Sequence, residues 1–102
     1  MNDIRIDVGV DTTLEIDLTQ FDFAGVHKVV FTVKNGIDPS FRIIVEKEFE
    51  ENKVHQINIT PEESRRMKEG AVYDFNMILS NGTRHKIGEN GRVILRRGVG
   101  NA

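Results

Sequence analysis

Cysteine is absent from the 102 residues, and so is tryptophan. Without cysteine the chain has no disulfide, no thiol nucleophile and none of the usual Cys zinc sites. No apolar run approaches the roughly 20 residues of a membrane-spanning helix, and we expect the acidic, alternating start MNDIRIDVGV to be neither a signal nor a transit peptide. A chain of this length can bury a core without metal. We expect one domain over residues 1–97 and a flexible tail over 98–102.

The net charge of −2 hides an asymmetry between the two halves of the chain. Residues 1–51 contain 5 Lys and Arg against 11 Asp and Glu, a balance of −6. Residues 52–102 contain 9 against 5, a balance of +4. In the favoured interpretation the strands of the two halves interleave and the charges form ordinary solvated faces. In the other, a bipolar subunit docks its acidic face onto the basic face of a copy or a partner.

Apolar residues recur with period two along most of the chain, which predicts β-strands with one buried and one solvent-exposed face. Two early runs, residues 4–8 and 14–18, have acidic residues on the face that is expected to meet solvent. In residues 26–33, Val30 makes the second face partly apolar as well, so we expect this strand to be central in its sheet. Further runs of this kind are residues 41–49, 53–59 and 71–80.

Between two of these runs the sequence ITPEESRRMKEG predicts a short helix over about residues 61–68. Thr60 suits the N-cap, because its hydroxyl can accept a hydrogen bond from an unpaired N–H of the first turn. Pro61 fits the first helical position, and Glu63 completes a capping box with Thr60. Gly70 is expected to close the helix in the left-handed conformation. Two turns are not stable alone, so tertiary contacts must hold this helix.

The strand after this helix indicates the architecture. Residues 71–80 place Tyr73 and three further apolar side chains on one face. A short helical corner followed by a strand with an early tyrosine is a known way for a chain to leave one sheet of a β-sandwich and enter the other. We therefore predict an all-β protein, an immunoglobulin-like antiparallel β-sandwich of about seven to nine strands with one short corner helix. A small closed barrel is the main alternative.

Three Asn-Gly pairs mark expected turns, since both residues tolerate the positive φ that a type I′ hairpin turn requires. Asn81-Gly82 lies between two strand-like runs and is the strongest local signal in the chain. Asn90-Gly91 is expected to separate the two final strands. The pair at 35–36 begins a longer connection.

These features also stand in an order that resembles a known family. An acidic strand and a long central strand precede INITPEES, and an early tyrosine, an Asn-Gly hairpin and a final GxVxL strand follow. In this order the chain resembles the immunoglobulin-like N-terminal domain of phage baseplate upper proteins and related short prophage tail proteins, most strongly over residues 57–97. The resemblance implies the sandwich fold, no catalytic residues and a structural role in a virion. The residues that carry it are Ile59, Thr60, Pro61, Glu62, Glu63, Gly70, Tyr73, Phe75, Asn81, Gly82, Gly91, Val93 and Leu95.

No constellation for catalysis or metal binding stands out. His27, His55 and His85 share no metal-ligand spacing, and the serines lack the context of a nucleophile elbow. No glycine-rich loop opens a helix, so no nucleotide cradle is expected. We predict no catalytic residue, no metal site and no cofactor.

Basic residues gather in the last predicted hairpin. Arg92, Arg96 and Arg97 form a stripe that Arg84 and Lys86 can extend. Nucleic-acid binding would use stacking aromatics among such residues, and this segment has none. A solvated or edge-protecting face is the favoured interpretation, and a protein interface at the three arginines is the functional one.

The favoured function is a non-enzymatic structural or assembly protein of a phage or prophage particle, in its tail or baseplate. Its expected partners are further copies of itself, as a homo-oligomer, or other tail and baseplate proteins, with no nucleic acid and no membrane. Its expected location is the host cytoplasm during assembly and then the virion. The alternative is a β-sandwich ligand-binding module, for carbohydrate in particular, against which stand the missing tryptophan and the single tyrosine. An enzyme is the least favoured class.

Overall fold

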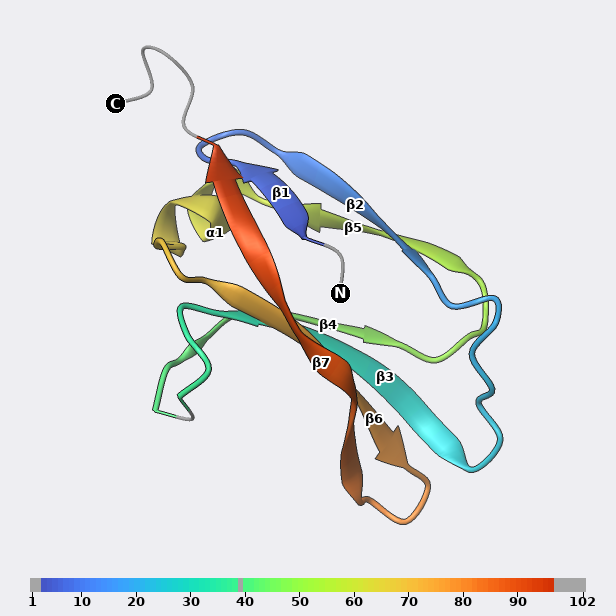
Figure 1. Ribbon diagram of the computed structural model, residues 1–102. Helices are drawn as coiled ribbons and strands as arrows, with labels where there is room; N and C mark the ends of the chain where they lie inside the picture. Colours follow the sequence, from blue (N-terminus) through green and yellow to red (C-terminus); the bar gives the residue numbers. More distant parts are fainter. Residues whose placement is uncertain (1–2, 39, 97–102) are drawn as a thin grey trace.

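The computed structural model describes residues 3–38 and 40–96, and it consists of strands with one short helix (Figure 1). The prediction of an all-β sandwich with a corner helix is confirmed. The predicted tail, residues 98–102, lies outside the described residues. The elements are β1 (Ile4–Asp7), β2 (Thr12–Asp17), β3 (Val26–Lys34), β4 (Ile43–Phe49), β5 (Val54–Ile59), α1 (Pro61–Arg66), β6 (Val72–Leu79) and β7 (Arg84–Arg96).

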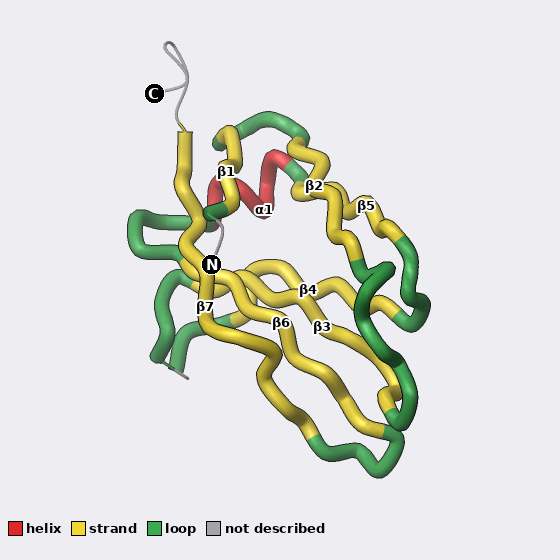
Figure 2. The backbone as a smooth tube through the Cα atoms, turned by 45° about the vertical axis from the view of Figure 1, so that its right-hand side comes forward, coloured by secondary structure: helices red, strands yellow, loops and turns green. Residues whose placement is uncertain are grey.

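The strands form two sheets that lie one above the other (Figure 2). The larger sheet has five strands in the order β1-β7-β6-β3-β4, and the smaller sheet is the antiparallel pair β2-β5. The run β7-β6-β3 corresponds to the G-F-C run of an immunoglobulin sheet, with β4 added at its edge, while β2 and β5 correspond to the B-E pair of the opposite sheet. The strand order therefore agrees with the predicted architecture.

The core lies between the two sheets and centres on β3, the central strand that the sequence predicts. Phe31 is fully buried, and its ring packs against Tyr73 and Phe75 with centroid distances of 5.8 and 5.2 Å. The outer face of β3 is buried as well, because Val30 and Thr32 lie in the middle of the sheet between β6 and β4. Both faces of β3 are thus removed from water over residues 29–33, which explains the nearly continuous apolar sequence of that part.

The helix begins as predicted. The Thr60 hydroxyl accepts a hydrogen bond from the Glu63 N–H at 3.1 Å, and the Thr60 N–H donates to Glu63 Oε1 at 2.9 Å, so the capping box is complete. Pro61 lies in the first turn. The buried Ser64 hydroxyl donates to Pro61 O at 2.7 Å and accepts from Gly9 N–H at 2.8 Å, which ties the helix to the β1–β2 connection. Because α1 carries the chain from β5 to β6, it is the predicted crossover between sheets.

The end of the helix corrects two predictions. The helix stops at Arg66, two residues earlier than predicted, and Met67 is extended with φ −79° and ψ 142°. The Asn35 amide donates to Arg66 O at 3.0 Å, and its Oδ1 accepts from Lys68 N–H at 2.7 Å. A side chain just after β3 thus satisfies backbone groups that the end of the helix leaves unpaired. Gly70 does not close the helix. Its φ of +91° serves the turn that leads into β6.

The Asn81-Gly82 pair forms the predicted β6–β7 hairpin, but with a different turn. Gly82 has φ +88°, and no non-glycine residue among those described has a positive φ, so the turn is not type I′. Leu79 N–H donates to Thr83 O at 2.8 Å, and Gly82 N–H donates to Leu79 O at 2.8 Å. This is the three-residue hairpin loop with glycine in the left-handed position.

The Asn90-Gly91 pair does not turn the chain, which corrects the prediction of a second hairpin. Both residues lie within β7, where Gly91 pairs with Tyr73 of β6. The register of β6 and β7 shifts between this pair and the next, Phe75–Ile87, and Gly88 with φ +69° lies in the resulting bulge. A Cβ atom on Gly91 would lie 2.2 Å from Tyr73 Cε2, so glycine is required here for the close approach of a ring.

The first strand corrects the expectation of purely antiparallel pairing. β1 pairs parallel with Val93–Arg96, the C-terminal part of β7. Since β1 has only 4 residues, it covers only this part. Among the described residues, β7 therefore has no neighbouring strand on this side over residues 84–92.

Candidate functional site

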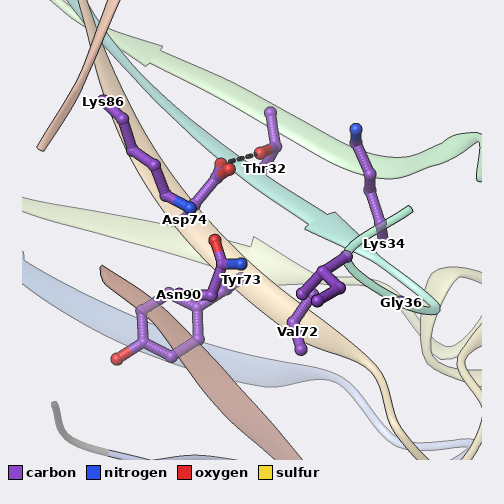
Figure 3. Close-up of a pocket in the computed structure, with 9 residues that line it drawn as sticks. Thr32, Lys34, Gly36, Val72, Tyr73, Asp74, Lys86 and Asn90 are labelled. Carbon is purple, nitrogen blue, oxygen red and sulfur yellow. Dashed lines mark hydrogen bonds between the residues drawn. The ribbon is translucent and has the colours of Figure 1, made fainter. Parts of the chain in front are cut away.

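A small polar pocket lies on the outer face of the larger sheet (Figure 3). At its centre, Asp74 Oδ1 accepts hydrogen bonds from the Thr32 hydroxyl and, at 3.1 Å, from the Asn76 amide. Lys86 and Asn90 contribute to its rim. Its volume of about 70 Å³ is far below the roughly 300 Å³ of the smallest ligand pockets. The polar groups at its centre bind one another, and we assign no substrate to it.

A larger, mostly apolar cleft of about 350 Å³ opens between the two sheets. Ile16 of β2 and Leu18 just after it line this cleft on one side, and the larger sheet contributes Tyr73, Phe75 and Ile87. The cleft exists because the two-stranded sheet is too narrow to cover the inner face of five strands. Its volume lies in the range of small-molecule sites, and its charged lining groups are two carboxylates of β2.

Two of the three histidines come together at one end of the sandwich, which their sequence spacing did not indicate. His27 and His55 line one open groove with Glu50 and Glu51. His55 Nε2 lies 2.7 Å from Glu51 O, and the His55 ring packs on Phe49 with centroids 4.6 Å apart. Within the part of the chain that the structure describes, no group of three His, Asp or Glu side chains is arranged to hold a metal ion.

The displaced pKa values have structural causes. Hydrogen bonds from the Thr19 hydroxyl at 2.6 Å and N–H at 2.9 Å lower the pKa of Asp17, an exposed carboxylate that stabilises the turn after β2. Burial, and next the negative charge of Asp3, raises the pKa of Tyr73.

The predicted basic stripe is partly neutralised within the chain. Arg92 binds Asp3 with 2.9 Å between Nη2 and Oδ2, and Arg96 Nε lies 3.7 Å from Asp7 Oδ1. Arg97 lies outside the described residues. The two ion pairs join β7 to Asp7 of β1 and to Asp3 just before it, so the acidic and basic halves interleave at this edge, as the favoured interpretation of the charge asymmetry expects. Exposed pairs of this kind contribute little to stability, but they give these arginines partners inside the chain.

Three strand edges of the larger sheet have no neighbouring strand among residues 3–38 and 40–96. They are the outer edge of β1, the outer edge of β4, and β7 over residues 84–92. Ile43 of β4 is 47% exposed, and Ile37 and Phe41 in the β3–β4 connection are 72% and 45% exposed. Unpaired N–H and C=O groups are a template for pairing with another chain, and neighbouring exposed apolar side chains indicate a contact site.

No family model matches this chain, and no curated protein matches its sequence. The function is therefore argued from the geometry of these surfaces.

The sequence did not show that Glu46 lies at a sheet edge. Glu46 belongs to the predicted strand over residues 41–49, and Arg84 and Lys86 were predicted to extend the arginine stripe. Only the strand order shows that the acidic residue and the two basic residues lie on opposite open edges of one sheet. No pattern within a single strand contains this information.

Proposed function

We propose that this protein is a non-enzymatic assembly module that acts through protein–protein contacts, and that it is a tail or baseplate component of a phage or prophage particle. The observation that carries the proposal is that the larger sheet has open edges, one of them the edge of β4, where Ile43 is 47% exposed. Soluble proteins usually cover or interrupt such edges. An edge that stays open beside exposed apolar groups is suited to contact with another chain.

The phage part of the proposal rests on the sequence resemblance. Several residues that carry the resemblance have clear structural roles. Thr60 and Glu63 form the capping box of the crossover helix, and Tyr73 packs on Gly91. A particle component of this kind is made in the host cytoplasm and is then incorporated into the virion.

The test is a measurement of assembly. The purified protein is studied by light scattering over a wide concentration range, and its binding to phage tail and baseplate proteins is measured. Self-association or binding to one of those proteins is expected. A strict monomer at high concentration that binds none of them would overturn the proposal.

The apolar cleft supports a second candidate, a ligand-binding module. Its volume of about 350 Å³ would accommodate a small molecule. For carbohydrate the aromatic platform is weak, because Tyr73 is 4% exposed and Phe41 is the phenylalanine that faces solvent. Saturable binding on a glycan array would reverse this ranking, and a Phe41→Ala variant would show whether that ring is the platform.

A further inference from the structure

We propose that two of the open edges of the larger sheet, those of β4 and of β7 over residues 84–92, bind each other between copies of this chain. β7 of one copy pairs antiparallel with β4 of the next, so the five-stranded sheet continues from copy to copy. This inference rests on the proposed function and deepens it, because it names the surfaces and the partner through which the module assembles.

The strand directions suit this arrangement. β7, β6, β3 and β4 are antiparallel at each step, so β4 runs opposite to β7. A second copy in the same orientation, displaced along the sheet, brings its β7 antiparallel to β4 of the first copy. Because the two edges are different surfaces, the contact is heterologous and builds a ring or a filament.

The charges of the two edges are complementary on one face of the sheet. The cross-strand pairs Lys86–Asn76, Asn76–Val30 and Val30–Glu48 show that Lys86 and Glu48 lie on the same outer face. Arg84, two residues before Lys86 on β7, also lies on this face. The outer face thus has basic side chains at the β7 edge and acidic side chains at the β4 edge.

One antiparallel register between neighbouring copies satisfies both faces of the sheet. It places two basic residues opposite two acidic residues on the outer face, and two apolar residues opposite each other on the inner face. The pairs are Arg84–Glu48, Lys86–Glu46 and Ile87–Val45. Opposite charges directly across a ladder stabilise the pairing of strands. The intervening pair, His85–Lys47, adds no attraction.

These charges are available for a neighbour to different degrees. Glu46, Arg84 and Lys86 have no ion-pair partner among the described residues, whereas Glu48 already binds Lys28 at 2.6 Å. We therefore expect Lys86–Glu46 to be the strongest pair between copies.

The same charges select against symmetric contacts. Pairing β4 with β4, or β7 with β7, would bring like charges together, which destabilises a ladder. Charged edge residues protect a sheet from indiscriminate pairing. Here they disfavour pairing of β4 with β4 and of β7 with β7, and they leave pairing of β4 with β7 between copies favourable.

Charge reversal is the first test. Lys86→Glu and Glu46→Lys, each alone, place like charges across the contact, so each is expected to weaken self-association by about tenfold in sedimentation equilibrium. The double variant Lys86→Glu/Glu46→Lys restores opposite charges and is expected to recover association. Arg65→Glu and Glu69→Lys, which are exposed and lie outside the paired segments of both strands, are the matched controls and should leave it unchanged.

Cysteine cross-linking is the second test. Because the chain has no cysteine of its own, only the introduced cysteines can form disulfides. Within one copy, residues 46 and 86 are three strand spacings apart, about 14 Å, which exceeds the roughly 7 Å limit between Cα atoms for a disulfide. The variant Glu46→Cys/Lys86→Cys is therefore expected to form a ladder of covalent oligomers under mild oxidation. Glu46→Cys/Arg65→Cys is the control and should not form it.

The outcomes separate this inference from the proposed function. Recovery by the double variant together with the specific ladder supports both. Self-association that persists in both single variants, or a wild-type monomer that still binds a tail protein, overturns the edge contact and leaves the assembly role standing. A monomer without any partner overturns both.

Discussion

At Gly91 the backbone of β7 passes directly against the ring of Tyr73, and alanine at this position is expected to destabilise the fold. The added Cβ would lie 2.2 Å from Tyr73 Cε2 and 2.3 Å from Cζ, where ordinary contacts begin at 3.4 Å. The ring would have to retreat by about 1.2 Å. It is buried against Phe31, and a close-packed interior cannot absorb such a shift without strain.

Overpacking of this kind costs about 2–3 kcal/mol, which corresponds to a fall in Tm of roughly 10–20 °C for a domain of this size. Urea unfolding gives the free energy directly. The chain has one tyrosine and no tryptophan, so its intrinsic fluorescence reports on the residue in question. Circular dichroism gives an independent signal that tests two-state behaviour.

A double-mutant cycle separates the ring contact from other effects of glycine replacement. In a Tyr73→Leu background the aromatic ring is absent, so Gly91→Ala should cost much less there. Gly82→Ala is the control, because nothing lies within 4 Å of its Cβ and its penalty arises only from φ +88°. Its effect, about 1 kcal/mol, should be the same in both backgrounds. An undiminished effect of Gly91→Ala without the ring, or no effect with it, refutes the reasoning.

The remaining predictions concern the helix and the tyrosine. Thr60→Ala removes the N-cap and should lower the free energy of unfolding by about 1 kcal/mol, whereas Thr60→Ser should largely retain it; equal losses in urea titrations would contradict the capping role. Asn35→Ala removes two hydrogen bonds at the end of α1 and should cost about 1–2 kcal/mol, with faster amide exchange at the helix end; unchanged exchange would contradict this. Because the pKa of Tyr73 is raised above its ordinary value of 10.0, its neutral form is favoured in the folded state. Stability should be fully present below pH 10 and decline as pH rises through the folded-state pKa, and Tyr73→Phe should lose this decline.

The sequence predicted correctly those parts of the fold that depend on residues close to one another along the chain. Alternation of side chains identified the strands, and the capping box of Thr60 and Glu63 needs only residues three apart. The helix end was wrong because Asn35, more than 30 residues away, competes for its terminal groups. No local signal could reveal that contact.

The error at Asn90-Gly91 has a related cause. The pair is compatible with a turn, and also with a strand whose glycine lies against a ring. The position of Tyr73 across the ladder decides between the two, and it depends on the register of β6 and β7. The ion-pair partners of Arg92 and Arg96 could not be predicted for the same reason. The parallel pairing of β1 with β7 brings together segments that are far apart in the sequence.

The parallel pairing of β1 with β7 also has a consequence for synthesis. The ion pair between Asp3 and Arg92 spans 89 positions of the chain. On the ribosome, the segment that contains β1 emerges early and cannot take its place until the segment that contains β7 has followed. Such high contact order slows folding, and the wait leaves a short, half-apolar segment without its hydrogen-bonding partner in the nascent protein.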